Sequence, residues 1–89
     1  MRLGFGIKLK IYKRRSGQVY DVLTVETMPE MTPRELMFLL RDVADVGDIV
    51  EYDGCVYKME PKWLQVLTHA ESRAVMAQCK AELRAGGER

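Results

Sequence analysis

The sequence predicts an α+β domain in which two β-hairpins form an antiparallel sheet and two helices pack on one face of that sheet. Three observations predict this class. Apolar and polar residues alternate between residues 7 and 27, an Asp-Gly pair divides a second apolar stretch, and helix-capping patterns begin two further segments. The expected order is therefore β-β-α-β-β-(β)-α. A chain of 89 residues is long enough for one small core, so residues 1–89 are expected to form a single domain.

The first hairpin is expected within residues 7–27. Ile7, Leu9 and Ile11 are separated by polar residues, as in a strand with one buried face. Pairing Ile11 with Leu23 keeps apolar residues together and sets Lys13 opposite Asp21. A slip by one residue would place lysines on the apolar face, so the first register is favoured. It implies a loop of about three residues in which Gly17 or a neighbour adopts positive φ.

The first helix is expected to run from Pro33 to about Asp45. Thr32 and Glu35 are spaced for a capping box, and Pro33 suits the first helical position. The predicted core stripe is Leu36, Leu39, Leu40 and Val43. Phe38 should point away from this stripe. Burial under residues 28–31 is the favoured outcome for Phe38; the alternative is an exposed apolar patch with Met37, ringed by acids.

The second hairpin is expected to turn at Asp53-Gly54, the preferred pair for a type I′ turn. Its predicted core face holds Val50, Cys55, Tyr57 and Met59. Residues 63–67 fit either a fifth strand or a helical turn, with strand favoured. Thr68 and Glu71 repeat the capping-box spacing and begin a helix to about Ala85, with a frayed tail from about residue 86.

Charge is sorted along the chain. Residues 1–20 carry six basic side chains and no acid, whereas residues 21–60 carry ten acids and three bases. A fold that kept this separation would have one positive and one negative region, and such fields select partners. The acids expected around the first helix and second hairpin include Asp42, Asp45, Glu51 and Asp53.

Residue types needed for catalysis are sparse. The single histidine, His69, is expected in the first turn of the second helix, and Cys55 and Cys79 lack the short spacing of zinc motifs. We therefore expect no enzyme activity, no metal and no cofactor, and burial of both cysteines. No apolar run approaches the length of a membrane span, and the first residues do not form a signal peptide, so a cytoplasmic protein is expected.

The function favoured by these features is a small non-catalytic interaction module, an adaptor or inhibitor that docks through its acidic face. Met37 or Phe38 would be the apolar anchor, and the partner a protein with a basic surface, such as one that handles nucleic acid. A second copy of the chain is a further candidate partner, because the acids would attract its basic hairpin head to tail.

The alternative function is nucleic-acid binding by the basic first hairpin. One side of its first strand combines cations with aromatic surface, and Tyr20 is expected across from Arg14. The residues that would carry this function are Lys8, Lys10, Tyr12, Lys13, Arg14 and Arg15.

Overall fold

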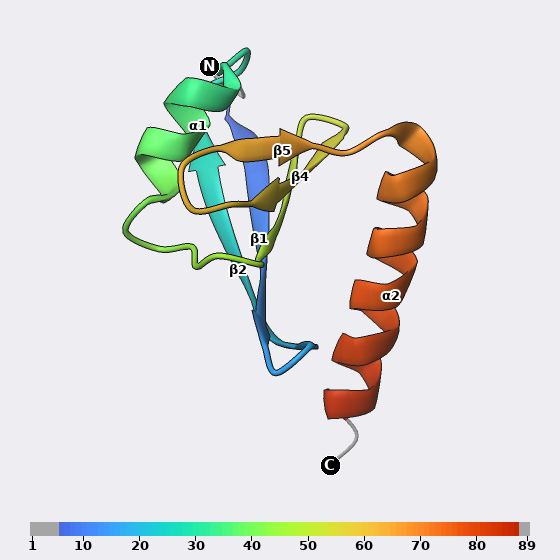
Figure 1. Ribbon diagram of the computed structural model, residues 1–89. Helices are drawn as coiled ribbons and strands as arrows, with labels where there is room; N and C mark the ends of the chain where they lie inside the picture. Colours follow the sequence, from blue (N-terminus) through green and yellow to red (C-terminus); the bar gives the residue numbers. More distant parts are fainter. Residues whose placement is uncertain (1–5, 88–89) are drawn as a thin grey trace, which may run out of the picture.

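The computed structural model describes residues 6–87, which form one antiparallel five-stranded sheet and two helices (Figure 1). The elements are β1 (Ile7–Arg15), β2 (Gln18–Thr27), α1 (Pro33–Leu40), β3 (Ile49–Tyr52), β4 (Cys55–Met59), β5 (Leu64–Val66) and α2 (His69–Gly87). The strand order is β2-β1-β3-β4-β5. The predicted α+β class and both predicted hairpins are confirmed, and residues 64–66 adopt the favoured strand.

The β1–β2 hairpin has the predicted register from Ile7 opposite Thr27 to Lys13 opposite Asp21. Beyond Lys13 the register shifts, so that Arg14 lies opposite Val19 and not opposite Tyr20, as the sequence had suggested. The turn is shorter than expected because Ser16 and Gly17 both adopt positive φ, 56° and 78°. A bulge at Tyr20 then accommodates the extra residue of β2.

The β3–β4 hairpin turns at Asp53 and Gly54, whose φ values of 49° and 81° fit the predicted type I′ turn. Pairing of β1 with β3 joins the two hairpins, with Ile11 opposite Val50. Cys55, expected in the core, is exposed because it lies directly after the turn, at the projecting tip of the hairpin. Tyr52, opposite Cys55, is buried instead.

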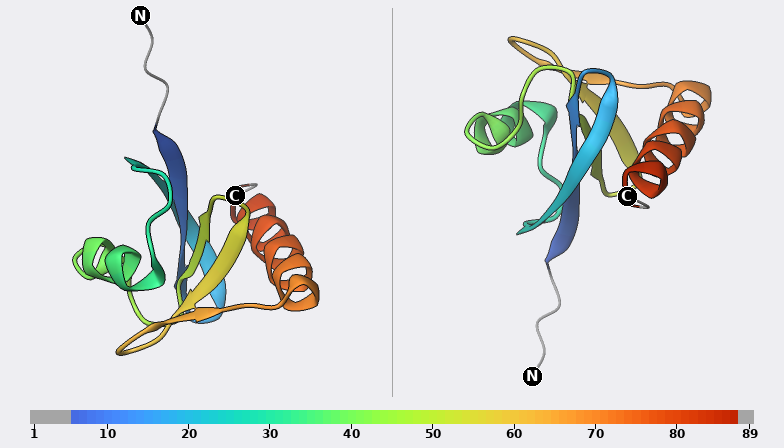
Figure 2. Two further views of the ribbon diagram at one scale, coloured as in Figure 1. Left: turned by 90° about the horizontal axis from the view of Figure 1, so that it is seen from above. Right: turned by 90° about the horizontal axis from the view of Figure 1, so that it is seen from below.

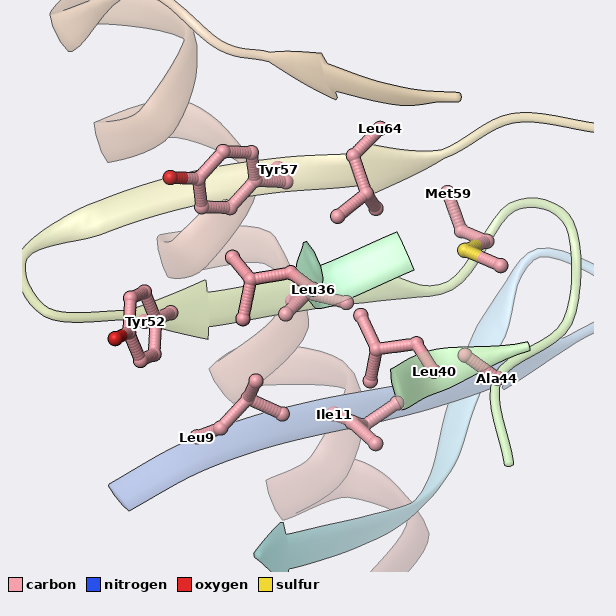
Figure 3. Packing of buried hydrophobic residues seen from close by; sticks show 10 residues of the cluster. Leu9, Ile11, Leu36, Leu40, Ala44, Tyr52, Tyr57, Met59 and Leu64 are labelled. Carbon is pink, nitrogen blue, oxygen red and sulfur yellow. The ribbon is translucent and has the colours of Figure 1, made fainter. Parts of the chain in front are cut away.

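The two helices cover opposite faces of the sheet, which corrects the expectation that both pack on one face (Figure 2). Leu36 and Leu40 of α1 lie over the face that carries Leu9 and Ile11, as the close view of this core shows (Figure 3). Val50 belongs to the same buried cluster. Cys79 of α2 packs on the other face, with a second cluster formed by Tyr12, Val19, Ile49 and Val56. Successive side chains of a strand point to opposite faces, so this second apolar cluster needs its own cover.

Helix α1 ends at Leu40, five residues before its predicted end. The chain turns there, and the amides of Val43 and Ala44 both donate to the carbonyl of Leu40. As a result Val43, expected in the core stripe, is exposed, and Ala44 is buried instead. Leu39, also expected in that stripe, lies within α1 and is exposed as well. Both capping boxes are present, at Thr32 with Glu35 and at Thr68 with Glu71.

Helix α2 ends at Gly87, two residues beyond its predicted end; the last two residues of the expected frayed tail lie outside the described residues. Neither helix, within the described chain, is long and apolar enough to cross a membrane.

Candidate functional site

Phe38 is a large aromatic side chain of α1 that is exposed to solvent. With 72% of its surface exposed, it is not buried under residues 28–31 as the sequence favoured. The reason lies in Tyr52, whose hydroxyl donates to the carbonyl of Met28 (2.6 Å) and accepts from the amide of Met31 (3.0 Å). These bonds hold the β2–α1 connection against the sheet, so it does not fold over Phe38.

Two hollows flank Phe38, about 700 and 560 Å³ in volume. The first lies between α1 and the β2–α1 connection and is lined by Glu26, Thr27, Met28, Pro29, Glu30, Met31, Arg34, Glu35, Phe38 and Leu39. The second lies between α1 and the β4–β5 connection and is lined by Pro33, Arg34, Met37, Phe38, Arg41, Lys62, Trp63 and Leu64. In the right view of Figure 2, the β2–α1 connection and the β4–β5 connection lie on either side of α1. The residues lining both hollows are called here the Phe38 surface.

Large apolar side chains are exposed on both sides of Phe38. Met28 in the first hollow is 73% exposed, and Trp63 in the second is 55% exposed. Single exposed apolar residues are common, but three large ones gathered around two hollows that share Phe38 are of the kind found at binding sites.

The two hollows have opposite charge. Glu26, Glu30 and Glu35 line the first, which we call the acidic side of the Phe38 surface. Arg41 and Lys62 line the second, the basic side, which contains no acid, and Arg34 lines both. The Arg41 guanidinium lies over the Phe38 ring, 5.1 Å from its centre. Phe38 therefore lies on the boundary between the two charges.

The basic first hairpin, the alternative site, is largely engaged within the fold. Tyr12 and Lys13 are buried, and the Lys13 ammonium lies 2.7 Å from Asp48 and 2.9 Å from Asp45. The half-buried Arg14 lies 3.5 Å from Glu82 and contacts the thiol of Cys79. Arg15 is exposed but stacks on Tyr20, 4.5 Å from the ring centre.

The remaining lysines of this hairpin face acids on neighbouring strands. Lys8 is paired in register with Glu26 of β2, and Lys10 with Glu51 of β3. The positive and negative segments of the sequence are thus adjacent strands of one sheet. These register pairs bring opposite charges close together, although within the described residues neither Lys8 with Glu26 nor Lys10 with Glu51 forms a salt bridge.

The four predicted acidic site residues do not line either hollow. Asp42 and Asp45 are exposed on the α1–β3 connection, and Asp45 pairs with Lys13. Glu51 is half-buried and accepts a bond from the Tyr12 hydroxyl (3.4 Å), while Asp53 is exposed in the β3–β4 turn. The two predicted apolar anchors do meet at the site, with Phe38 exposed and Met37 half-buried in the second hollow.

Burial contributes to the shifted pKa values of the titratable groups Tyr12 and Cys79. Burial raises the pKa of the Cys79 thiol, although Arg14 opposes this shift. Cys79 lies on the face of α2 that packs on the sheet and is fully buried there. Burial and Glu51 together raise the pKa of Tyr12. His69 is exposed at the start of α2, and within residues 6–87 no group of three potential metal ligands gathers.

Met28 and Trp63 were missed by sequence reasoning. Both lie in short connections beside a proline, Met28 before Pro29 and Trp63 two residues after Pro61. Connections between elements usually run over the surface, and this was the available signal, although Met31 in the same connection as Met28 packs against the core. In comparisons with known proteins, no family model, curated protein or solved structure matches the chain.

Proposed function

We propose that this protein is a non-catalytic interaction module, an adaptor or inhibitor that docks on another protein through the Phe38 surface. The observation that carries the proposal is the exposure of Phe38 between two hollows lined by further exposed apolar side chains. Interface centres are enriched in aromatic residues, methionine and arginine, and this surface contains all three.

Burial of the Phe38 ring by a partner would supply much of the binding energy. Removing a phenylalanine side chain from water contributes about 1.5–3 kcal/mol, and such residues are frequent hot spots. Because Phe38 packs on little of its own fold, the partner would gain this energy without disturbing the core.

The proposed partner is a protein segment that places an apolar side chain beside Phe38 and basic residues against the acidic side. Glu26 and Glu30 are exposed, and within the described residues neither forms an ion pair. A protein that itself handles nucleic acid would offer such a basic segment.

Nucleic-acid binding by the first hairpin receives less support. Tyr12, Lys13 and Arg14, three of its six candidate residues, are committed to contacts within the fold. Lys8 and Lys10 each have an acid in register on the next strand.

The test compares Phe38→Ser with Val46→Ser in affinity purification from a cell extract. Val46 is a matched control because it is 61% exposed and lies outside both hollows. We expect a protein retained by the wild type and by Val46→Ser to be lost from Phe38→Ser, with thermal unfolding of all three unchanged. Retention of every partner by Phe38→Ser would contradict the proposal.

A further inference from the structure

The Phe38 surface carries opposite charges on its two sides, and this arrangement favours a specific partner. Acids lie on one side of Phe38 and bases on the other. Within residues 6–87, the only ion pairs involve Lys13 and Arg14, so neither side of this surface is neutralised by a salt bridge of the described chain. The surface therefore offers unpaired charges of both signs across an apolar centre.

A surface of this kind is complementary to itself. A two-fold rotation about an axis near Phe38 places the acidic side of one copy against the basic side of the other, and it does so twice. The two Phe38 rings would lie near the axis, where aromatic pairs pack favourably. Two identical charge contacts around one apolar centre make the patch self-complementary, which is the property that an isologous dimer requires.

We infer that a second copy of this chain docks on the Phe38 surface to form a two-fold symmetric dimer. Met28 and Trp63, which lie in opposite hollows of one chain, would become neighbours across the interface. Contact of a methionine sulfur with an aromatic ring is favourable, so this pairing adds to the apolar centre. The inference goes beyond the proposed function: dimerisation covers the same surface and competes with the partner protein.

A single-stranded nucleic acid is the other occupant that the basic side would suit, because it combines cations with Phe38 and Trp63. The acidic side argues against it. A phosphate backbone that continued past Phe38 would meet Glu26 and Glu30, whereas a second copy of the chain brings bases to that position.

The experiment uses two reciprocal variants, Glu26→Lys/Glu30→Lys and Arg41→Glu/Lys62→Glu. Glu35 is left unchanged because its carboxylate caps α1. Each variant alone opposes like charges across the two-fold axis, so its dimerisation should weaken by at least about tenfold. A 1:1 mixture of the two should restore association as a heterodimer, since one surface is then predominantly basic, with Glu35 as its remaining acid, and the other predominantly acidic, with Arg34 as its remaining base.

The control separates this surface from net charge. Lys58→Glu/Arg73→Glu changes two exposed bases outside the Phe38 surface and has the same net charge as Arg41→Glu/Lys62→Glu. It should dimerise like the wild type, and it should not form the heterodimer with Glu26→Lys/Glu30→Lys. Circular dichroism would establish that all the variants are folded.

Sedimentation equilibrium at low salt and native mass spectrometry provide the readouts. A concentration-dependent wild-type dimer, lost in each reciprocal variant and regained in their mixture, is the expected result. The inference is overturned if the wild type stays monomeric up to about 1 mM, if the mixture stays monomeric, or if the wild type carries nucleic acid, seen at 260 nm, that Arg41→Glu/Lys62→Glu no longer carries. The purification test with Phe38→Ser can succeed in any of these cases, so the two proposals fail separately.

Discussion

Asp48 is a buried acid that links strand β1 to the α1–β3 connection. It is fully buried, and its carboxylate accepts bonds from the amides of Arg14 (2.9 Å) and Asp45 (2.8 Å). The ammonium of Lys13 lies 2.7 Å from the same carboxylate. Strand β1 and the α1–β3 connection are thereby tied together. The sequence suggested only a turn residue at this position, since burial of an acid depends on partners distant in the chain.

Replacement of Asp48 should therefore be costly. Asp48→Asn cannot accept both amide bonds and removes one charge from a buried pair, so we expect a loss of about 3 kcal/mol of unfolding free energy. Asp45→Asn is the matched control, because Asp45 contacts the same ammonium but is exposed, and its loss should stay under about 1 kcal/mol. Urea denaturation measures both values. Equal losses would show that burial of Asp48 does not matter.

The same network predicts how stability depends on alkaline pH. Burial lowers the pKa of Lys13, but hydrogen bonds and attraction from Asp48 and Asp45 outweigh it, so the pKa is raised above its ordinary value. The unfolded chain has the ordinary value of about 10.4. The pair therefore stabilises fully below that pH, and its contribution is lost as pH rises through the higher folded pKa.

Comparison with Lys13→Met isolates this effect. Tyr12 and Tyr57 also have raised pKa values, so their ionisation at high pH destabilises the fold. The wild type and Lys13→Met both retain these tyrosines, so this contribution is common to the two. Above about pH 10.4 the wild type should lose unfolding free energy more steeply than Lys13→Met. Parallel curves between pH 9 and pH 12, measured by urea denaturation, would refute the role of the ion pair.

At the scale of elements, short-range chemistry was predictable from the sequence. The Thr32 and Thr68 capping boxes and the turn at Asp53 involve residues within three positions of each other. The register of the first hairpin followed from keeping Ile11 and Leu23 on one face. Each of these features depends on a local pattern that only one conformation satisfies.

Features that depend on a third element were not predictable. Tyr12 and Val56 lie on the face opposite Ile11, where they pack with α2. Apolar residues on the second face of a sheet do not by themselves tell whether that face is open to solvent or covered by a helix. The sequence therefore placed both helices on one face. The site was predicted in part for the same reason: Met37 and Phe38 are adjacent in α1, whereas Met28 and Trp63 reach the surface from separate connections.

The shape of the first hollow depends on one contact between elements. In Tyr52→Phe the carbonyl of Met28 and the amide of Met31 lose their shared hydroxyl, which should cost about 1–3 kcal/mol. The β2–α1 connection should loosen, so the Met31 amide should exchange with solvent faster. Tyr20→Phe is the control, because Tyr20 is exposed on β2. Unchanged Met31 exchange in Tyr52→Phe would contradict this account.

In the whole molecule, folding brings the basic and acidic segments of the sequence close together. The sequence separates six early bases from an acidic middle. The sheet brings them back together, through register pairs such as Lys10 with Glu51 and through the buried Lys13 pair. A docking surface based on a single large field is therefore less well supported than one based on local chemistry. The Phe38 surface combines two exposed aromatic side chains, Phe38 and Trp63, with charges of both signs around two hollows.

The central claim is that the Phe38 surface is where other polypeptides dock. The most direct measurement places a photoreactive phenylalanine analogue at position 38 and, separately, at position 46, and identifies the covalent adducts by mass spectrometry. Position 46 is equally accessible but lies outside both hollows. The account predicts a discrete adduct with another polypeptide at position 38 and none at position 46. The same adduct at both positions, or adducts only at position 46, would contradict it.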